Sequence, residues 1–418
     1  MIFVANILEM NGGTTFLIRT CEALRARGEQ CAVVVLRRGG DVALAAALAG
    51  QATVLMLEDF QPDRGHVFRK HFGAFAPLYW SRLQQALAPF GSTIHAMGAF
   101  GLIIAARLGR HIPSLRITAG IYHQNEFVFR DRALFSRQIL SIFRALPPEN
   151  VVFFNEIGRE NYSLFHAIDY TKRAPLTPIG IKIAPGRPSI QDHEPGYEIV
   201  SIGALEPFKT YNTHVITLLP ELGRLFPGVR YHVYGAGECL EPLRSRATAL
   251  GVADNVLFHG LLPYERFHDV VRHADVFVGS GTALIEAASL GRPALIGIES
   301  MAQPVTYGFL SDVAGLSYNE SGLAQDTRSM LDCLRAVLSD AARWRVVAEA
   351  CSVKAAEFFV DRTAEAFVRL QEESLPTPAL ISPSGVARLL AELPALALWD
   401  KMSPEFAFAR RRNQSFQR

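Results

Sequence analysis

The chain alternates between two patterns of hydrophobic and polar positions. Short apolar runs bounded by glycine, asparagine or histidine are separated by longer stretches with apolar residues at helical spacing, such as 16–27 and 135–146. In the first half, the runs expected to form strands are 2–7, 31–36, 52–57, 92–95, 115–119, 151–154 and 176–179. Strands that alternate with helices indicate parallel sheets covered on both faces.

The alternation stops once and then restarts. Residues 184–196 are rich in proline and polar residues, which is typical of a linker. Beyond it, strands are expected at 198–203, 230–234, 255–258, 276–279 and 294–298. The pattern therefore predicts an α/β protein with two Rossmann-like, doubly wound domains, over 1–185 and 197–355, joined by a linker over 186–196.

The tail over 356–418 has a different pattern. A helix is expected over 361–373, and we expect it to return to the N-terminal domain. A second amphipathic segment over 386–393 precedes an arginine-rich end. Three arrangements of this basic end stay open: packing on the first domain, contact with anionic lipid, or a solvated tail.

Composition narrows the classes of function. The 42 basic and 40 acidic residues leave a net charge of +2, which argues against a dedicated nucleic-acid-binding protein. The five cysteines show no metal-ligand spacing, so we expect reduced thiols in a cytoplasmic protein. The N-terminus lacks the basic start of a signal peptide, and no apolar run approaches the ~20 residues of a membrane span.

The most informative segment lies at 276–293. An apolar strand runs into Gly279, Ser280, Gly281 and Thr282, and a helix is expected to follow at once. Glycines let a backbone approach a ligand closely, and the unpaired N–H groups of a helix N-terminus attract an anion. Glu286 follows within that helix and is suited to bind neighbouring hydroxyls, such as those of a ribose. These residues predict a site for a nucleoside diphosphate that carries another group.

Further strand ends carry residues of the same kind. They are Gly12 and Gly13 after the first strand, Gly203 and Lys209 after the first strand beyond the linker, Gly235 and Gly237 after the next, and Gly260, Leu261 and Leu262 after the third. Lys209 has the reach and charge to contact a phosphate. The backbone after Gly260 is placed to read a base, and Tyr264 either stacks on that base or packs internally.

In this order and spacing, the segments resemble the C-terminal half of GT-B-fold glycosyltransferases, particularly the large family 4 that uses nucleotide-sugar donors. The matching positions are Gly203, Leu205, Lys209, Gly235, Gly237, 256–260, 274–278, Glu286, Ala287, Gly291 and Pro293. The first half resembles the family at Gly12 and Gly13, at 94–98, at His123 and at 177–181. The resemblance covers about 1–370 and excludes the tail.

Two positions depart from the family pattern. Ala204 stands where the family usually has an arginine, so one cation expected near the diphosphate is missing from its place. The family also commonly has a glutamate eight residues before the helix glutamate, and that position is Val278 here. It is therefore open which group of this chain stabilises the donor sugar during transfer.

The resemblance implies a retaining, metal-independent hexosyltransferase with no cofactor beyond its nucleotide-sugar co-substrate. Lys209 and the backbone at Gly13, Gly281 and Thr282 would hold the diphosphate, Glu286 the ribose and His123 the donor sugar. The acceptor would be a glycan, a lipid-linked sugar or a small molecule, with no nucleic acid involved. The enzyme would be cytoplasmic, in polysaccharide biosynthesis, with contact at the inner face of the membrane as an alternative.

Two other functions stay open, namely a nucleotide-sugar epimerase and a non-catalytic subunit that binds nucleotide. Three further features are candidates for acceptor or membrane contact. Glu126 and Glu156 follow strands of the first half, and 64–72 mixes cations with aromatic residues. Solvated surface groups are the alternative for each.

Overall fold

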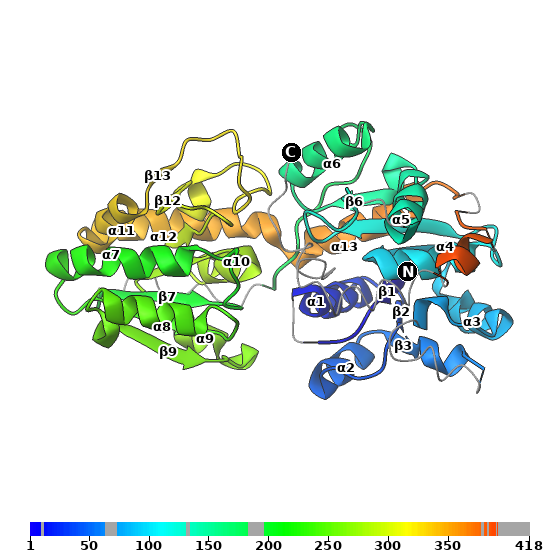
Figure 1. The fold of residues 1–418 in the computed structure, drawn as a ribbon, viewed down its shortest axis with the longest axis horizontal. Helices are drawn as coiled ribbons and strands as arrows, with labels where there is room; N and C mark the ends of the chain where they lie inside the picture. Colours follow the sequence, from blue (N-terminus) through cyan, green and yellow to red (C-terminus); the bar gives the residue numbers. More distant parts are fainter. Residues whose placement is uncertain are drawn as a thin grey trace. The chain divides into compact units, whose positions relative to one another are not determined.

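A computed structural model of the chain describes residues 1–9, 12–62, 73–130, 134–182, 196–377, 380–382, 384–389 and 391. The chain divides into two compact units, of which Met1–Gly180 with Val360–Arg418 form the first and Ile181–Phe359 the second (Figure 1). Each unit contains one large parallel sheet.

The first unit is built on a six-stranded parallel sheet in the order β3-β2-β1-β4-β5-β6. Its strands are β1 (Ile2–Ala5), β2 (Ala32–Val35), β3 (Thr53–Met56), β4 (Thr93–Met97), β5 (Arg116–Ile121) and β6 (Val151–Phe153). Successive side chains of β1 enter opposite cores, because Ile2 and Val4 join one hydrophobic cluster while Phe3 and Ala5 join another. The continuous apolar strands are therefore explained by burial on both faces.

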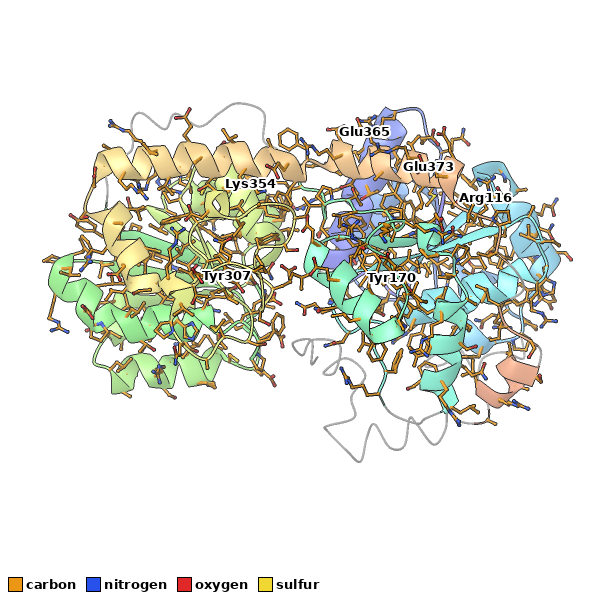
Figure 2. The ribbon with its side chains drawn as sticks, turned by 90° about the horizontal axis from the view of Figure 1, so that it is seen from above. Arg116, Tyr170, Tyr307, Lys354, Glu365 and Glu373 are labelled. Carbon is orange, nitrogen blue, oxygen red and sulfur yellow. The ribbon has the colours of Figure 1, made fainter. Side chains whose placement is uncertain are left out.

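Helices supply the layers on both faces of this sheet. They are α1 (Gly12–Ala26), α2 (Val42–Ala49), α3 (Trp80–Leu87), α4 (Ala99–Gly109), α5 (Leu134–Arg144), α6 (Glu156–His166) and α13 (Val360–Glu373). The late helix α13 packs on α1, and Arg27 pairs with Glu365 at 3.0 Å. Figure 2 shows Glu365 and Glu373 along α13, near whose C-terminal end Arg116 donates to the carbonyl of Gln371 at 2.9 Å.

The second unit has a five-stranded parallel sheet in the order β11-β10-β7-β8-β9. Its strands are β7 (Glu198–Ile202), β8 (Arg230–Tyr234), β9 (Val256–Gly260), β10 (Val276–Gly279) and β11 (Ala294–Ile296), with a small antiparallel pair β12 (Val305–Thr306) and β13 (Arg328–Ser329). The buried Asp275 carboxylate accepts from the N–H of Gly196 at 3.0 Å and of Glu198 at 2.6 Å, which fixes the start of β7.

The helices of the second unit are α7 (Tyr211–Leu225), α8 (Leu240–Ala249), α9 (Phe267–Val271), α10 (Gly281–Ser289), α11 (Met330–Leu338) and α12 (Ala341–Ala355). Helix α12 packs on α10 and α11 (Figure 1). Its buried Lys354 is satisfied by the Gly315 carbonyl at 2.8 Å and by Glu357 at 2.6 Å. A single large hydrophobic cluster forms the core of this unit.

The fold class expected from the sequence is confirmed, with local corrections. Residues 176–179 do not form a strand, since only Leu176 makes an isolated bridge, to Phe153. The first helix begins at Gly12 rather than at 16, so Gly12 and Gly13 lie in its first turn. The linker residues 183–195, the stretch 64–72 and the arginine-rich end lie outside the described residues. No helix in the described parts has both the length and the apolar character needed to cross a membrane.

Candidate functional site

The second unit has a topological switch point between β7 and β10. These strands are neighbours and run parallel, while β8 and β9 follow on one side and β11 on the other. The hydroxyl of Ser201 donates to the Val278 carbonyl at 2.6 Å, where the two strands end. In open α/β sheets, ligands bind beyond the carboxyl ends of strands at such a point. The segments after β7 and β10 are therefore the first place to search for a site.

The segment after β7 carries Lys209. Its ammonium nitrogen lies 3.0 Å from where a Cβ on Gly203 would sit, so the side chain folds back over the end of its own strand. Within the described parts of the chain, Lys209 makes no ion pair within 4.0 Å. The N–H of Ser300 donates to the Phe208 carbonyl at 2.7 Å, which joins this loop to the segment after β11. A partly buried ammonium that has no ion-pair partner within 4.0 Å is suited to bind an anion.

The loop that carries Lys209 is held in place by close backbone packing at three glycines, Gly203, Gly235 and Gly237. All three have φ between +145° and +155°. A Cβ on Gly235 would lie 1.9 Å from the Gly203 carbonyl oxygen, and one on Gly237 would lie 2.3 Å from that of Leu205. We expected these glycines to let a ligand approach; Gly235 and Gly237 instead lie closest to neighbouring backbone, and Gly203 lies closest to the Lys209 side chain. They lock the ends of β7 and β8 together and so position Lys209.

The segment after β10 begins a helix, and β10 is the neighbour of β7, the strand that precedes the Lys209 loop. Helix α10 begins at Gly281, whose φ is +64° and where an added Cβ would meet nothing within 4 Å. The preceding Ser280 is in the N-cap position, but its side chain makes no capping bond, and its buried hydroxyl has no hydrogen-bond partner of acceptable geometry. The buried hydroxyl of Thr210, before α7, is also unpartnered. Such groups usually find partners in the complete complex.

Glu286 and Thr282 stand four residues apart on α10 and so share one face of that helix. Thr282 is partly exposed, whereas Glu286 is 4% exposed. The structure thus places Lys209 in the loop after β7, and Ser280, Gly281, Thr282 and Glu286 in the segment after the adjacent strand β10. Their roles toward a nucleotide stay predictions.

The segment after β9 is joined to the same edge. The N–H of Gly235 donates to the Gly260 carbonyl at 2.7 Å, and Gly260 has a φ of +71°. Leu261 beyond it is 79% exposed, and Leu262 is partly exposed. Tyr234 stacks on His259 with ring centroids 4.3 Å apart, so two rings flank the expected base-reading loop. This stacked pair was not predicted from the sequence, although period-two spacing along β8 and β9 was a usable signal.

A cluster of polar residues that the sequence analysis missed lies next to Lys209. Glu299 follows β11, and its carboxylate accepts from the Asn319 amide at 2.7 Å. Burial raises the pKa of Glu299, while Lys209 acts in the opposite direction. Burial and then the nearby Glu299 raise the pKa of Glu320 to about 7. Only the position of Glu299 after a buried strand could have indicated it.

The remaining predicted residues belong to the first unit. Gly12 and Gly13 open α1, and His123 follows β5, where its carbonyl accepts from the N–H of Glu126 at 3.1 Å. Glu126 is buried rather than a surface carboxylate, and it accepts from the N–H of Ala99 at 3.2 Å. The roles predicted for Gly13 and His123 toward the ligand of the second unit stay predictions.

Comparison with known proteins agrees with the expected resemblance. Residues 187–303 match the family model described as "Glycosyl transferases group 1". A GDP-mannose-dependent alpha-(1-6)-phosphatidylinositol monomannoside mannosyltransferase of Mycobacterium tuberculosis is 30% identical over 145 residues. This match covers 32% of the present chain and 35% of the mycobacterial enzyme, or about a third of its length.

Solved structures extend the likeness over most of the chain. Anabaena Alr3699/HepE, in complex with UDP and glucose, has a TM-score of 0.59 at 14% identity, over 88% of this chain and 98% of that one. TarM of S. aureus, in complex with UDP and a glycoside, has a TM-score of 0.62 at 10% identity, over 89% and 99%. At these identities the likeness concerns the fold, and the GT-B architecture is confirmed.

Proposed function

We propose that this chain is a glycosyltransferase that moves a sugar from a nucleoside-diphosphate sugar to an acceptor hydroxyl. The observation that carries the proposal is the convergence at the β7–β10 switch point. Lys209, the open Gly281 at the start of α10 and the unpartnered hydroxyl of Ser280 lie at neighbouring strand ends. The match of residues 187–303 to a glycosyltransferase family model covers the same segments.

Glycosyl transfer requires stabilisation of the diphosphate as it leaves. In this proposal, Lys209 and the N–H groups of Gly281 and Thr282 would meet the developing charge as preorganised donors. Glu286 would hold the ribose, the backbone after Gly260 the base, and His123 the donor sugar. Transfer would be retaining and independent of metal, with the leaving phosphate accepting the proton of the acceptor hydroxyl.

The relatives give the choice of donor to be tested. The mycobacterial relative is named as GDP-mannose-dependent, while two structural neighbours hold UDP. These names therefore support a hexose linked to either GDP or UDP as the donor. The names of these proteins also favour a lipid-linked sugar or a glycan as the acceptor class.

The first test is calorimetric titration with UDP-glucose, GDP-mannose and the free nucleotides UDP, GDP and ADP. We expect one of the nucleotide series to bind, and we expect that donor to support transfer to a lipid-linked or oligosaccharide acceptor in the presence of EDTA. The absence of binding by any of them would contradict the proposal. An isomerised sugar formed without acceptor would favour the epimerase, and tight binding without turnover of any donor would favour the non-catalytic subunit.

A further inference from the structure

Glu299 is a carboxylate close to the ammonium group that we expect to bind phosphate. Its own backbone N–H donates to the Asn319 carbonyl at 2.9 Å, and the Asn319 side chain donates back to the carboxylate at 2.7 Å. This two-way contact fixes Glu299 with one carboxylate oxygen engaged by the amide. The adjacent bond from Ser300 to Phe208 ties Glu299 to the Lys209 loop.

The segment that carries Asn319 is held in turn by the hydroxyl of Tyr307, a residue labelled in Figure 2. This hydroxyl donates to the Glu320 carbonyl at 3.2 Å and accepts from the N–H of Gly322 at 3.1 Å. Glu320 is buried, and its carboxylate accepts from the N–H of Tyr318 at 2.9 Å. Glu299, near Lys209, and Glu320, near Glu299, are therefore both held in place by hydrogen bonds.

The groups that face Glu299 come from three segments of the second unit. They are Lys209 after β7, Ser280 before α10, and Tyr318, Asn319 and Glu320 after the turn at Tyr307. The Ser280 hydroxyl is near enough to favour the charged form of Glu299, yet it makes no hydrogen bond of acceptable geometry. Among the described residues of this cluster, Lys209 is the one cation and the two glutamates are the anions.

Binding of a diphosphate changes the charge balance of this cluster. The phosphates bring negative charge beside Lys209, and like charges at close range disfavour the ionised form of a carboxyl group. Ala204 supplies no charge where the family has an arginine, and it is exposed at the end of β7. Burial already disfavours ionised Glu299 and Glu320. Protonation of one of them therefore relieves the repulsion without moving the backbone.

We propose that Glu299 takes up a proton from solvent when a nucleoside-diphosphate sugar binds beside Lys209, and then donates a hydrogen bond toward the phosphates. This inference rests on the proposed function. It adds to the proposed donor site a group, Glu299, whose protonation depends on pH. No covalent bond to the donor is made or broken in this step. The donor affinity should therefore fall as the pH rises through neutrality, because the bound state holds the additional proton.

The test is calorimetric titration of UDP-glucose and GDP-mannose at about pH 7.5, in buffers of different ionisation enthalpy. An intact nucleotide-sugar has no phosphate group that titrates near neutral pH, so protons taken up come to the protein. We expect an uptake of up to about one proton per donor bound. The Glu299→Gln variant should bind without this uptake, and its dissociation constant should change little between about pH 6 and 8.

Two further variants complete the design. Glu320→Gln tests the second carboxyl group and should reduce the uptake only in part. Glu349→Gln, on an exposed position of α12, is a matched control that should behave as the parent protein. Donor binding without proton uptake would overturn this inference alone, as would uptake that persists in Glu299→Gln. Failure of every donor to bind the parent protein across this pH range would instead overturn the proposed function, and this inference with it.

Discussion

The two sheets share one order over five strands, but the helix N-termini at their switch points differ. In the first unit, α4 begins at the switch between β1 and β4, and Glu126 occupies its N-terminus by accepting from the N–H of Ala99. A Cβ on Gly98 would lie 2.9 Å from that carboxylate. In the second unit, α10 begins at the switch between β7 and β10 with Ser280 unpartnered. One N-terminus is satisfied by the protein, and the other retains its capacity for an anion.

On β4, the strand that precedes α4, the buried side chain of His95 is also hydrogen-bonded within the protein. His95 is fully buried, with Nδ1 at 3.0 Å from the Thr118 hydroxyl and Nε2 at 2.9 Å from that of Tyr122. Burial lowers the pKa of His95 to about 3, so its ring is neutral at physiological pH. Topology alone therefore does not assign a ligand site. The unsatisfied groups at the strand ends distinguish the two edges.

The largest effect is expected from Gly235→Ala. The new methyl group would overlap the Gly203 carbonyl at a backbone angle that side chains rarely adopt, so we expect a loss of about 2–4 kcal/mol in the stability of the second unit. Thermal unfolding measures it. Gly223→Ala in α7, where a Cβ meets nothing within 4 Å, is the control and should be neutral or stabilising. Equal behaviour of the two variants would contradict the interlocked-loop description.

Lys209→Ala should reduce sugar transfer by about tenfold or more, because it removes one preorganised donor to the leaving diphosphate. Steady-state rates with the donor identified by titration measure the effect. Lys172→Ala, whose side chain is 82% exposed on the first unit, is the matched control. If Lys209→Ala transfers sugar at nearly the parent rate, Lys209 does not belong to the site. The contrast drawn between the switch points of the two sheets would then fail.

Glu286→Ala should weaken binding of UDP or GDP by about tenfold, as expected when hydrogen bonds from hydroxyls to a carboxylate are lost. Inorganic pyrophosphate, which has no ribose, should bind as tightly as before. Glu286→Gln keeps the buried volume and separates loss of folding from loss of affinity. If nucleotide and pyrophosphate lose affinity equally, the ribose assignment is wrong.

The smallest effect on donor binding should come from Glu126→Ala in the first unit. Loss of the group that satisfies the start of α4 should cost about 1–2 kcal/mol of stability, measured by thermal unfolding. The affinity for the nucleotide-sugar should stay within a factor of about two. A tenfold loss of donor affinity would show that the first edge takes part in phosphate binding, and the comparison would need revision.

Much of the architecture was predictable because buried parallel strands leave a strong apolar signal. The run at Val276–Gly279 and the Gly-Ser-Gly-Thr turn after it locate both a strand and the start of α10. The segment 176–179 misled the analysis because its apolar residues pack beside β6 without joining the ladder beyond Leu176. Period and composition do not distinguish these two outcomes.

The site was less predictable than the fold. Ser280 follows β10 directly and Lys209 lies in the loop after the adjacent β7, so strand order places them on one edge of the sheet. Glu299 and Asn319 come together only through the path of the chain after β11, which no short-range pattern encodes. Close backbone packing accounts for the glycines at 235 and 237, and their contact with a ligand stays a prediction. The sequence indicates that a position requires glycine, but it does not indicate whether a ligand or neighbouring backbone atoms lie close to that glycine.

The most direct test of the account is a crystal structure of the protein with UDP-glucose or GDP-mannose bound, whichever binds more tightly in titration. The account predicts density for the diphosphate at the start of α10, in contact with Lys209, the Ser280 hydroxyl and the N–H of Gly281, with Glu126 still at the start of α4. Diphosphate density at Gly98 in place of Glu126, with Lys209 and α10 free of ligand, would contradict it.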